Sequence, residues 1–276
     1  MNLAALSLWL SWRSHHLDPL ARPLPVTLVG TLRRAERRRL EGWLFLPGLL
    51  LLLALRALLY REIGAPAGWN PKLDLGPVVL AFRSDLLLPS LAYSALSFLR
   101  VATVFYFWLL VLVNRGALQP DPIQKLVRLQ LGRLGRWPWP IQLALSIGWV
   151  LFLWVSFQPV LVRLGVITPV HTWAHLLEQG LLIWAALLLS LKYLLPIFLL
   201  LHLVASYVYL GSNPLWEFIS ATATRLLAPL RPLPLRFARL DLAPVLGVIL
   251  IFLLLDWMPG FIILKLAQQN LSLWPQ

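Results

Sequence analysis

The chain has 276 residues, of which 59% are hydrophobic and only 13% are charged, with a formal net charge of +13. Apolar side chains in this proportion cannot all be buried in one soluble core. The composition therefore excludes a soluble globular protein and predicts a polytopic membrane protein. The absence of cysteine excludes disulfides, thiolate nucleophiles and cysteine-ligated metals. Because the basic residues lie beside apolar stretches, we expect contact with anionic lipids and no nucleic-acid partner.

Residues 1–42 are predicted to form a cytoplasmic segment. Residues 1–16 have no basic start before their short apolar run and no small-residue cleavage site, so we expect an interfacial anchor and no cleaved signal peptide. Residues 26–42 combine apolar side chains with clustered arginines, which predicts a basic amphipathic helix that binds anionic lipids. The arginines are Arg33, Arg34, Arg37, Arg38 and Arg39.

Five apolar stretches are predicted to cross the membrane. They cover residues 43–60, 86–113, 141–161, 181–210 and 245–264. The first is short for hydrocarbon about 30 Å thick, and its Arg56 lies near enough to one end for its charge to reach the interface. The second and fourth are long and must tilt or kink, with Pro196 as the expected kink in the fourth. Residues 61–85 carry balanced charges and turn formers, which suits an outer loop.

The distribution of basic residues predicts the orientation. Of the 24 lysines and arginines, 16 lie in the segments 1–42, 114–140 and 211–244. Cytoplasmic connectors carry an excess of positive charge, so the amino terminus is expected inside and the carboxyl terminus outside. The predicted location is the bacterial inner membrane.

The connector at residues 211–244 is too ordered to be a simple linker. Asn213 can cap a new helix and Pro214 suits its first position, and apolar residues then recur at helical spacing. We therefore expect an amphipathic helix on the membrane surface. Proline breaks, positive charge and a cap for the next span follow at Pro229, Leu230, Arg231, Pro232, Asp241, Leu242, Ala243 and Pro244.

This order of features resembles the YggT family of small integral membrane proteins, which often contain two copies of a two-span unit. The resemblance covers residues 185–265. It implies an accessory or assembly role, because family members are linked to the biogenesis of membrane complexes, including haem attachment to a cytochrome in plastids. Other members are linked to cell-envelope or division processes and to osmotic tolerance.

A weak internal repeat extends the resemblance. An offset of 92 residues places Pro122 on Pro214 and Arg100 on Lys192, and it predicts a second surface helix starting at Pro122. The first copy has Trp-Pro-Trp-Pro at 137–140 where the second has its proline and Asp-Leu-Ala-Pro motifs. The expected segments are 1–42, 43–85, 86–166 for the first repeat and 167–276 for the second.

Four ionisable residues inside apolar stretches are candidate functional groups: Arg100, Glu178, Lys192 and Asp256. An unpaired charge at mid-membrane costs about 2.5 kcal/mol or more, so each should face a partner, a cavity or another protein. We expect Asp256 to pair with Lys192, and Glu178 to act near the outer surface. Two alternatives stay open: the charges reach the interface along long helices, or they line an ion or proton pathway.

His171, His175 and Glu178 share one helical face at the outer end of the fourth span. Neutral imidazoles at this spacing can bind zinc or haem iron. The segment lacks the glutamate that follows the first histidine in zinc peptidases. A polar helix start is the simpler interpretation, and we expect no resident cofactor.

The sequence thus predicts an all-α, five-span membrane protein with cytoplasmic amphipathic helices. Enzyme signatures such as a phosphate-binding glycine loop or a Gly-x-Ser-x-Gly motif are absent, and we expect no catalytic residue. The first functional hypothesis is a scaffold, accessory subunit or assembly factor of a membrane complex. The alternatives are a small channel or transporter with Arg100, Lys192 and Asp256 in its path, and a haem-handling factor that uses His171 and His175.

Overall fold

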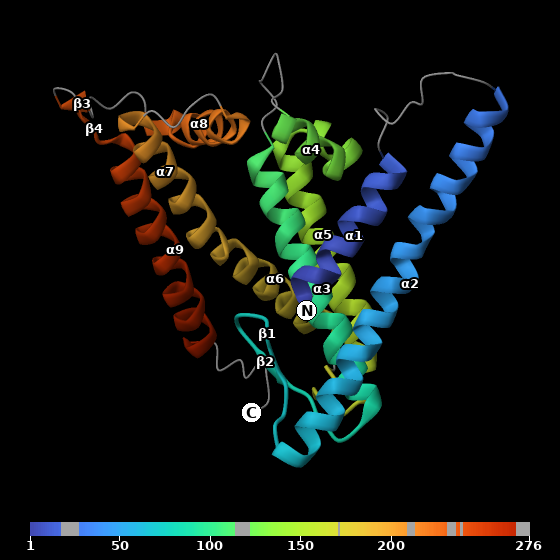
Figure 1. Ribbon diagram of the computed structural model, residues 1–276. Helices are drawn as coiled ribbons and strands as arrows, with labels where there is room; N and C mark the ends of the chain where they lie inside the picture. Colours follow the sequence, from blue (N-terminus) through green and yellow to red (C-terminus); the bar gives the residue numbers. More distant parts are fainter. Residues whose placement is uncertain are drawn as a thin grey trace. The chain divides into compact units, whose positions relative to one another are not determined.

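A computed structural model describes residues 1–17, 28–113, 122–170, 172–208, 213–230, 236–237 and 240–268. These residues are almost entirely helical (Figure 1). The α-helices are α1 (Asn2–Leu17), α2 (Leu28–Ala67), α3 (Leu87–Leu112), α4 (Pro122–Leu131), α5 (Trp139–Arg163), α6 (Trp173–Leu189), α7 (Leu191–Tyr207), α8 (Pro214–Leu226) and α9 (Ala243–Gln268). The short elements are 3₁₀ turns η1 (Gly132–Arg136) and η2 (Ala228–Leu230), and strands β1 (Lys72–Asp74), β2 (Val79–Ala81), β3 (Arg236–Phe237) and β4 (Leu240–Asp241).

Within the described residues, four helices are long and apolar enough to cross a membrane. They are Trp43–Gly64 in α2, Leu87–Leu112, Trp139–Arg163, and Trp173–Tyr207, which joins α6 and α7. The fifth predicted span coincides with α9, whose apolar stretch Ala243–Trp257 is shorter. The prediction of an all-α, multi-pass membrane protein is therefore confirmed.

The chain forms two compact units, which we describe separately. Unit 1 comprises Met1–Tyr106, Leu129–Gly132 and Gln158–Ile167. Unit 2 comprises Phe107–Arg128, Arg133–Phe157 and Thr168–Gln276.

Helix α1 belongs to the core of unit 1. Its Ala5 and Leu6 are buried in one cluster with Leu49 of α2 and with Phe98 and Ala102 of α3. The sequence predicted an interfacial anchor at this position, and the structure instead packs α1 against two candidate spans. The reason is composition: the first turns are apolar on nearly every side, so α1 has no polar face to present to water.

Two polar contacts give the register of α1 along α3. Asn2 Nδ2 donates to Ser97 Oγ at 3.1 Å, and Trp9 Nε1 donates to the Tyr106 hydroxyl at 2.9 Å. Helix α1 therefore follows α3 from near its middle towards the end at Leu112. Its 16 residues extend about 24 Å, which is shorter than hydrocarbon about 30 Å thick.

Residues 72–81, expected as part of a loop, form a small antiparallel hairpin. Strand β1 pairs with β2, with Leu73 opposite Leu80, and both side chains are buried. In the turn, Gly76 has φ +97°, and its N–H donates to Asp74 Oδ1 at 2.7 Å. Beyond β2, the buried Phe82 ring lies 5.6 Å from Tyr93 of α3 and fixes the hairpin to that helix.

In unit 2, the long apolar helix 173–207 is interrupted at one residue, Ser190. The Ser190 hydroxyl donates to the Leu187 carbonyl at 2.6 Å and competes with the backbone hydrogen bonds of the helix. It also accepts from Trp108 Nε1 at 2.9 Å. The sequence predicted a kink at Pro196, which lies inside α7, six residues after this interruption.

Helix α8 crosses the ends of α7 and α9, which lie side by side (Figure 1). Ala223 and Leu227 are buried against Leu199 of α7, with Val248 and Ile251 of α9 packed around them. The amphipathic helix that the sequence predicted at this place therefore buries its apolar face on the protein's own helices.

Substituting Gly64 by alanine should destabilise unit 1. A Cβ at Gly64 would lie 2.8 Å from Cβ of Ser84 and 3.1 Å from the Trp69 carbonyl oxygen, which is backbone and cannot move aside easily. We expect a loss of about 1–3 kcal/mol, measured by thermal unfolding in detergent. Gly48→Ala in the same helix is the control, because a Cβ there meets nothing within 4 Å. Equal melting temperatures for the two variants would contradict the packing described.

Candidate functional site

The apolar helices carry charged side chains that the structure satisfies in different ways. Lys192, in the first turn of α7, and Asp256, in α9, form an ion pair with Nζ and Oδ1 3.2 Å apart. The lysine side chain is 30% exposed and the carboxylate 59% exposed. The structure thus brings together the two residues that the sequence pairs. In surroundings without water, each neutralises a charge that would otherwise be costly to insert.

Glu178 lies in the first turns of α6, three residues after His175. Its Oε2 is 3.6 Å from Nδ1 of His175, and both side chains are partly exposed. His171, the other member of the predicted metal or haem face, lies outside the described residues. Elsewhere in the described part of the chain, no three histidine, aspartate or glutamate side chains cluster as a metal site requires. Metal or haem binding at this face stays the alternative to the expected polar helix start, and the structure tests neither.

Arg56 of α2 was expected to reach the interface, but it is buried in unit 1, with 4% of its surface exposed. Its guanidinium donates to the Tyr60 hydroxyl at 3.0 Å, to Ser97 Oγ at 3.1 Å and to Asn2 Oδ1. It also lies over the rings of Tyr60 and Tyr93, 5.2 and 5.6 Å from their centroids. All these groups are neutral, so the charge is stabilised by hydrogen bonds and aromatic faces and no carboxylate takes part.

A row of serines continues from this site along α3. Ser90, Ser94 and Ser97 are buried at i, i+4 and i+7, so they share one face of the helix. Ser94 Oγ donates to the Leu53 carbonyl of α2 at 2.9 Å. The polar strip thus holds α2 and α3 together from Arg56 towards the hairpin.

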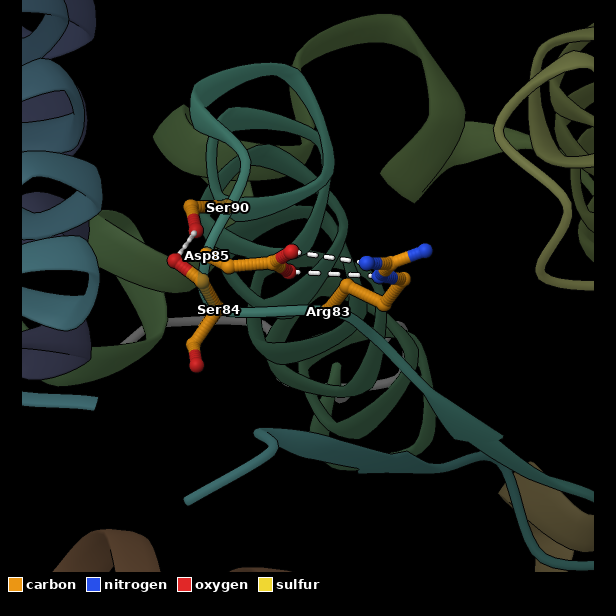
Figure 2. Close-up of polar contacts among 4 residues, drawn as sticks. All are labelled: Arg83, Ser84, Asp85 and Ser90. Atoms are coloured by element: carbon orange, nitrogen blue, oxygen red, sulfur yellow. Dashed lines mark hydrogen bonds and ion pairs between the residues drawn. The ribbon is translucent and has the colours of Figure 1, made fainter. Parts of the chain in front are cut away.

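Figure 2 shows the end of this strip, where Ser90 Oγ donates to the Ser84 carbonyl at 3.5 Å. Beside it, Arg83 donates two hydrogen bonds to Asp85, at 2.8 and 3.2 Å. These bonds hold the pKa of Asp85 below its usual value. The small stabilisation they give is present above that usual value and is lost as pH falls through the lowered one. Because both side chains are exposed to water, this ion pair contributes little to stability.

Arg100 differs from the other charges. It lies at the centre of α3 and is exposed. Within the described residues it makes no hydrogen bond and no ion pair. The partner that the sequence leads us to expect for Arg100 is therefore not found in this part of the chain.

Two surface helices of unit 2 are attached to the end of α3. Gln124 of α4 is 1% exposed and donates through Nε2 to the Leu112 carbonyl at 3.2 Å. Arg225 of α8 donates to the Val113 carbonyl. Such carbonyls have no partner within their own helix, and a cation there also interacts favourably with the helix dipole. We call α4 and α8 the end platform.

The predicted start of α8 is confirmed. Asn213 caps it by accepting from the Leu215 amide at 3.1 Å, and Pro214 is its first residue. The helix α4 also begins at a proline, Pro122, 92 residues earlier. Of the other motif positions, Pro229 lies in η2, Asp241 in β4 and Pro244 in the first turn of α9, whereas Arg231 and Pro232 lie outside the described residues.

Sequence reasoning missed Asn2 and Gln124 as functional partners. A polar residue beginning an apolar helix and a glutamine on the buried face of a surface helix were the available signals. Neither signal names the distant group that the side chain contacts. For the predicted lipid-binding arginines 33–39, the structure gives the helix α2 but not the side chains.

The fold and these charges together define the class, a multi-pass, all-α membrane protein. In comparisons with known proteins, the chain matched no protein-family model, and no match was found among curated proteins or solved structures. The resemblance to the YggT family therefore stays a prediction.

Replacing Asp256 by asparagine should lower stability by about 2 kcal/mol or more, because Lys192 is left charged in an apolar environment. Combining Lys192→Met with Asp256→Leu should recover most of this loss, since apolar side chains can replace an ion pair. Thermal unfolding in detergent measures both changes. Asp85→Asn is the control and should change stability little. Additive losses in the double variant would show that the pair is not coupled.

Arg56→Lys should destabilise unit 1 more than Arg56→Met. Lysine keeps the buried charge but cannot reach three separate acceptors, and each charge-assisted hydrogen bond is worth about 1.5–3 kcal/mol. Methionine removes the charge together with its desolvation cost. Melting temperatures should follow the order wild type, Met, Lys, with the exposed Arg61→Met as control. A lysine variant as stable as wild type would refute the assigned network.

Proposed function

We propose that this chain is a non-enzymatic scaffold, an accessory subunit or assembly factor of a complex in the bacterial inner membrane. The observation that carries the proposal is the end platform. Helices α4 and α8 are both bonded to the terminal carbonyls of α3, at Leu112 and Val113. A surface helix held by one hydrophobic face can rotate or lift, whereas these two are also fixed by side chain to backbone bonds.

The packing of α8 supports a rigid surface. Its Phe218 ring lies edge-on to Phe198 of α7, with centroids 5.9 Å apart, and Ser220 Oγ is 3.4 Å from Nδ1 of His202. The contacts of Arg225 add a third helix to those that hold α8. A preorganised surface loses little entropy when it binds, which favours stable association with a partner.

Basic residues on α4 and on the adjoining η1 turn support a position of the end platform at the cytoplasmic face. Lys125 of α4 and Arg133 and Arg136 of η1 are exposed next to the ends of apolar helices. Such side chains attract anionic lipids and the acidic surfaces of proteins. In this arrangement the connectors that hold most of the basic residues lie inside.

The contacts of the charged groups favour a scaffold over a channel. A conducting path through Lys192 and Asp256 needs both charges to face water or ions, but the two are bound to each other. These charges stabilise the helices that carry them. A scaffold requires only this stabilising role from the charged residues.

Purification in mild detergent tests the proposal. We expect the native chain to carry a fixed stoichiometry of other membrane subunits, resolved by native mass spectrometry. Combining Gln124→Ala with Arg225→Ala loosens the platform and should lower their recovery about tenfold, equivalent to about 1.4 kcal/mol. Arg61→Ala, an exposed substitution in α2 that lies outside the platform and leaves both bonds intact, is the control.

Three results would contradict the scaffold. The chain isolates alone from its own membrane under every mild condition; the purified chain gives salt flux in liposomes, as a channel would; or it shows a Soret band, as a haem-handling factor would.

A further inference from the structure

Arg100 is too deep in its helix for the interface to solvate it. Thirteen residues of α3 precede it and twelve follow it, between Leu87 and Leu112. At 1.5 Å per residue, either end of the helix is about 18 Å or more away. Hydrocarbon extends about 15 Å from the centre of a bilayer, and an arginine side chain covers less than half of that distance. The guanidinium therefore needs a partner at its own depth.

The second half of the chain shows how such a charge is satisfied. Lys192 lies 92 residues after Arg100, as Pro214 lies 92 residues after Pro122. The apolar helix that follows α8 supplies Asp256 to Lys192. In the first half, the helix that follows α4 is α5, and its sequence, Trp139–Arg163, contains no aspartate or glutamate. The first half of the chain therefore has a cation, Arg100, at the position that matches Lys192, but no carboxylate that matches Asp256.

The acidic residues in the described apolar helices do not supply one either. Of the chain's 11 acidic residues, only Glu62, Glu178 and Asp256 lie in the apolar helices. Asp256 is bound to Lys192, and Glu178 is near the start of α6 beside His175. Glu62 lies in the last turn of the apolar part of α2. A second copy of the chain would bring the same three residues, so a homodimer would not provide a carboxylate at the centre.

We propose that the Arg100 face of α3 is the docking site for a transmembrane helix of another protein that carries an aspartate or glutamate near its centre. The buried serines of α3 lie against α2, whereas Arg100 is exposed and Leu96, one turn earlier, is partly exposed. This inference rests on the proposed scaffold function and adds the chemistry of the partner. The carboxylate would stand to Arg100 as Asp256 stands to Lys192.

The test uses the full chain in its native membrane. A photoreactive amino acid at Leu96 should crosslink to one apolar helix of another protein, and mass spectrometry should find an acidic residue near the middle of that helix. The same probe at Leu88, 70% exposed near the start of α3, is the control and should give no such product. Arg100→Leu should reduce the crosslink at least tenfold, and Arg100→Lys should retain it.

Charge exchange decides whether the contact is electrostatic. Arg100→Asp should abolish the crosslink, and an arginine in place of the partner's acidic residue should restore it. Thermal unfolding of each variant in detergent identifies misfolding, and Arg100→Lys keeps the test valid if Arg100→Leu unfolds.

Other outcomes overturn the inference. These are a crosslink to a second copy of the chain, a crosslink to Glu178 or another part of the same chain, a partner helix without an acidic residue, or a crosslink unaffected by Arg100→Leu. In each case, subunits that still copurify through the end platform would leave the scaffold proposal standing. Loss of every associated subunit from the wild type would defeat both.

Discussion

Hydrocarbon offers no hydrogen-bond partner, and this one constraint explains most of the long-range polar contacts of the chain. Each deep polar group must be satisfied by another part of this protein or by a partner protein. Arg56 is enclosed by α1, α2 and α3, and Lys192 is paired with a carboxylate on α9. These tertiary contacts therefore replace the hydrogen bonds that water would otherwise provide.

Lys192 and Arg56, two cations inside apolar helices, are stabilised by different chemistry. An ion pair neutralises Lys192 directly and needs only one partner of opposite charge. Arg56 keeps its charge and spreads it over three hydrogen-bond acceptors and two aromatic rings, so its stability depends on several helices being in place at once. The first solution is local to α7 and α9, whereas the second couples α1, α2 and α3 into one cooperative unit.

The elements that depend on local sequence were predictable, and those that depend on distant contacts were not. The spans follow from the length of the apolar stretches, and the cap at Asn213 follows from capping chemistry. The ion pair of Lys192 with Asp256 follows from the high cost of an unpaired charge in the membrane. The burial of Arg56 could not be predicted, because composition alone cannot distinguish a side chain that reaches the interface from one enclosed by α1. The break at Ser190 depends on a hydroxyl bond to the helix's own backbone, a weaker signal than the nearby proline.

The bond between Arg225 and the Val113 carbonyl joins residues separated by 112 positions. The first half of the chain leaves the ribosome well before α8 is made. Gln124 of α4 can bond the Leu112 carbonyl early, but the Val113 carbonyl must be solvated by water or lipid headgroups until α8 exists. The contacts at this end of α3 are therefore completed only after the first spans have been synthesised. A truncation after α5 would keep the bond from Gln124 to the Leu112 carbonyl but leave the Val113 carbonyl without Arg225.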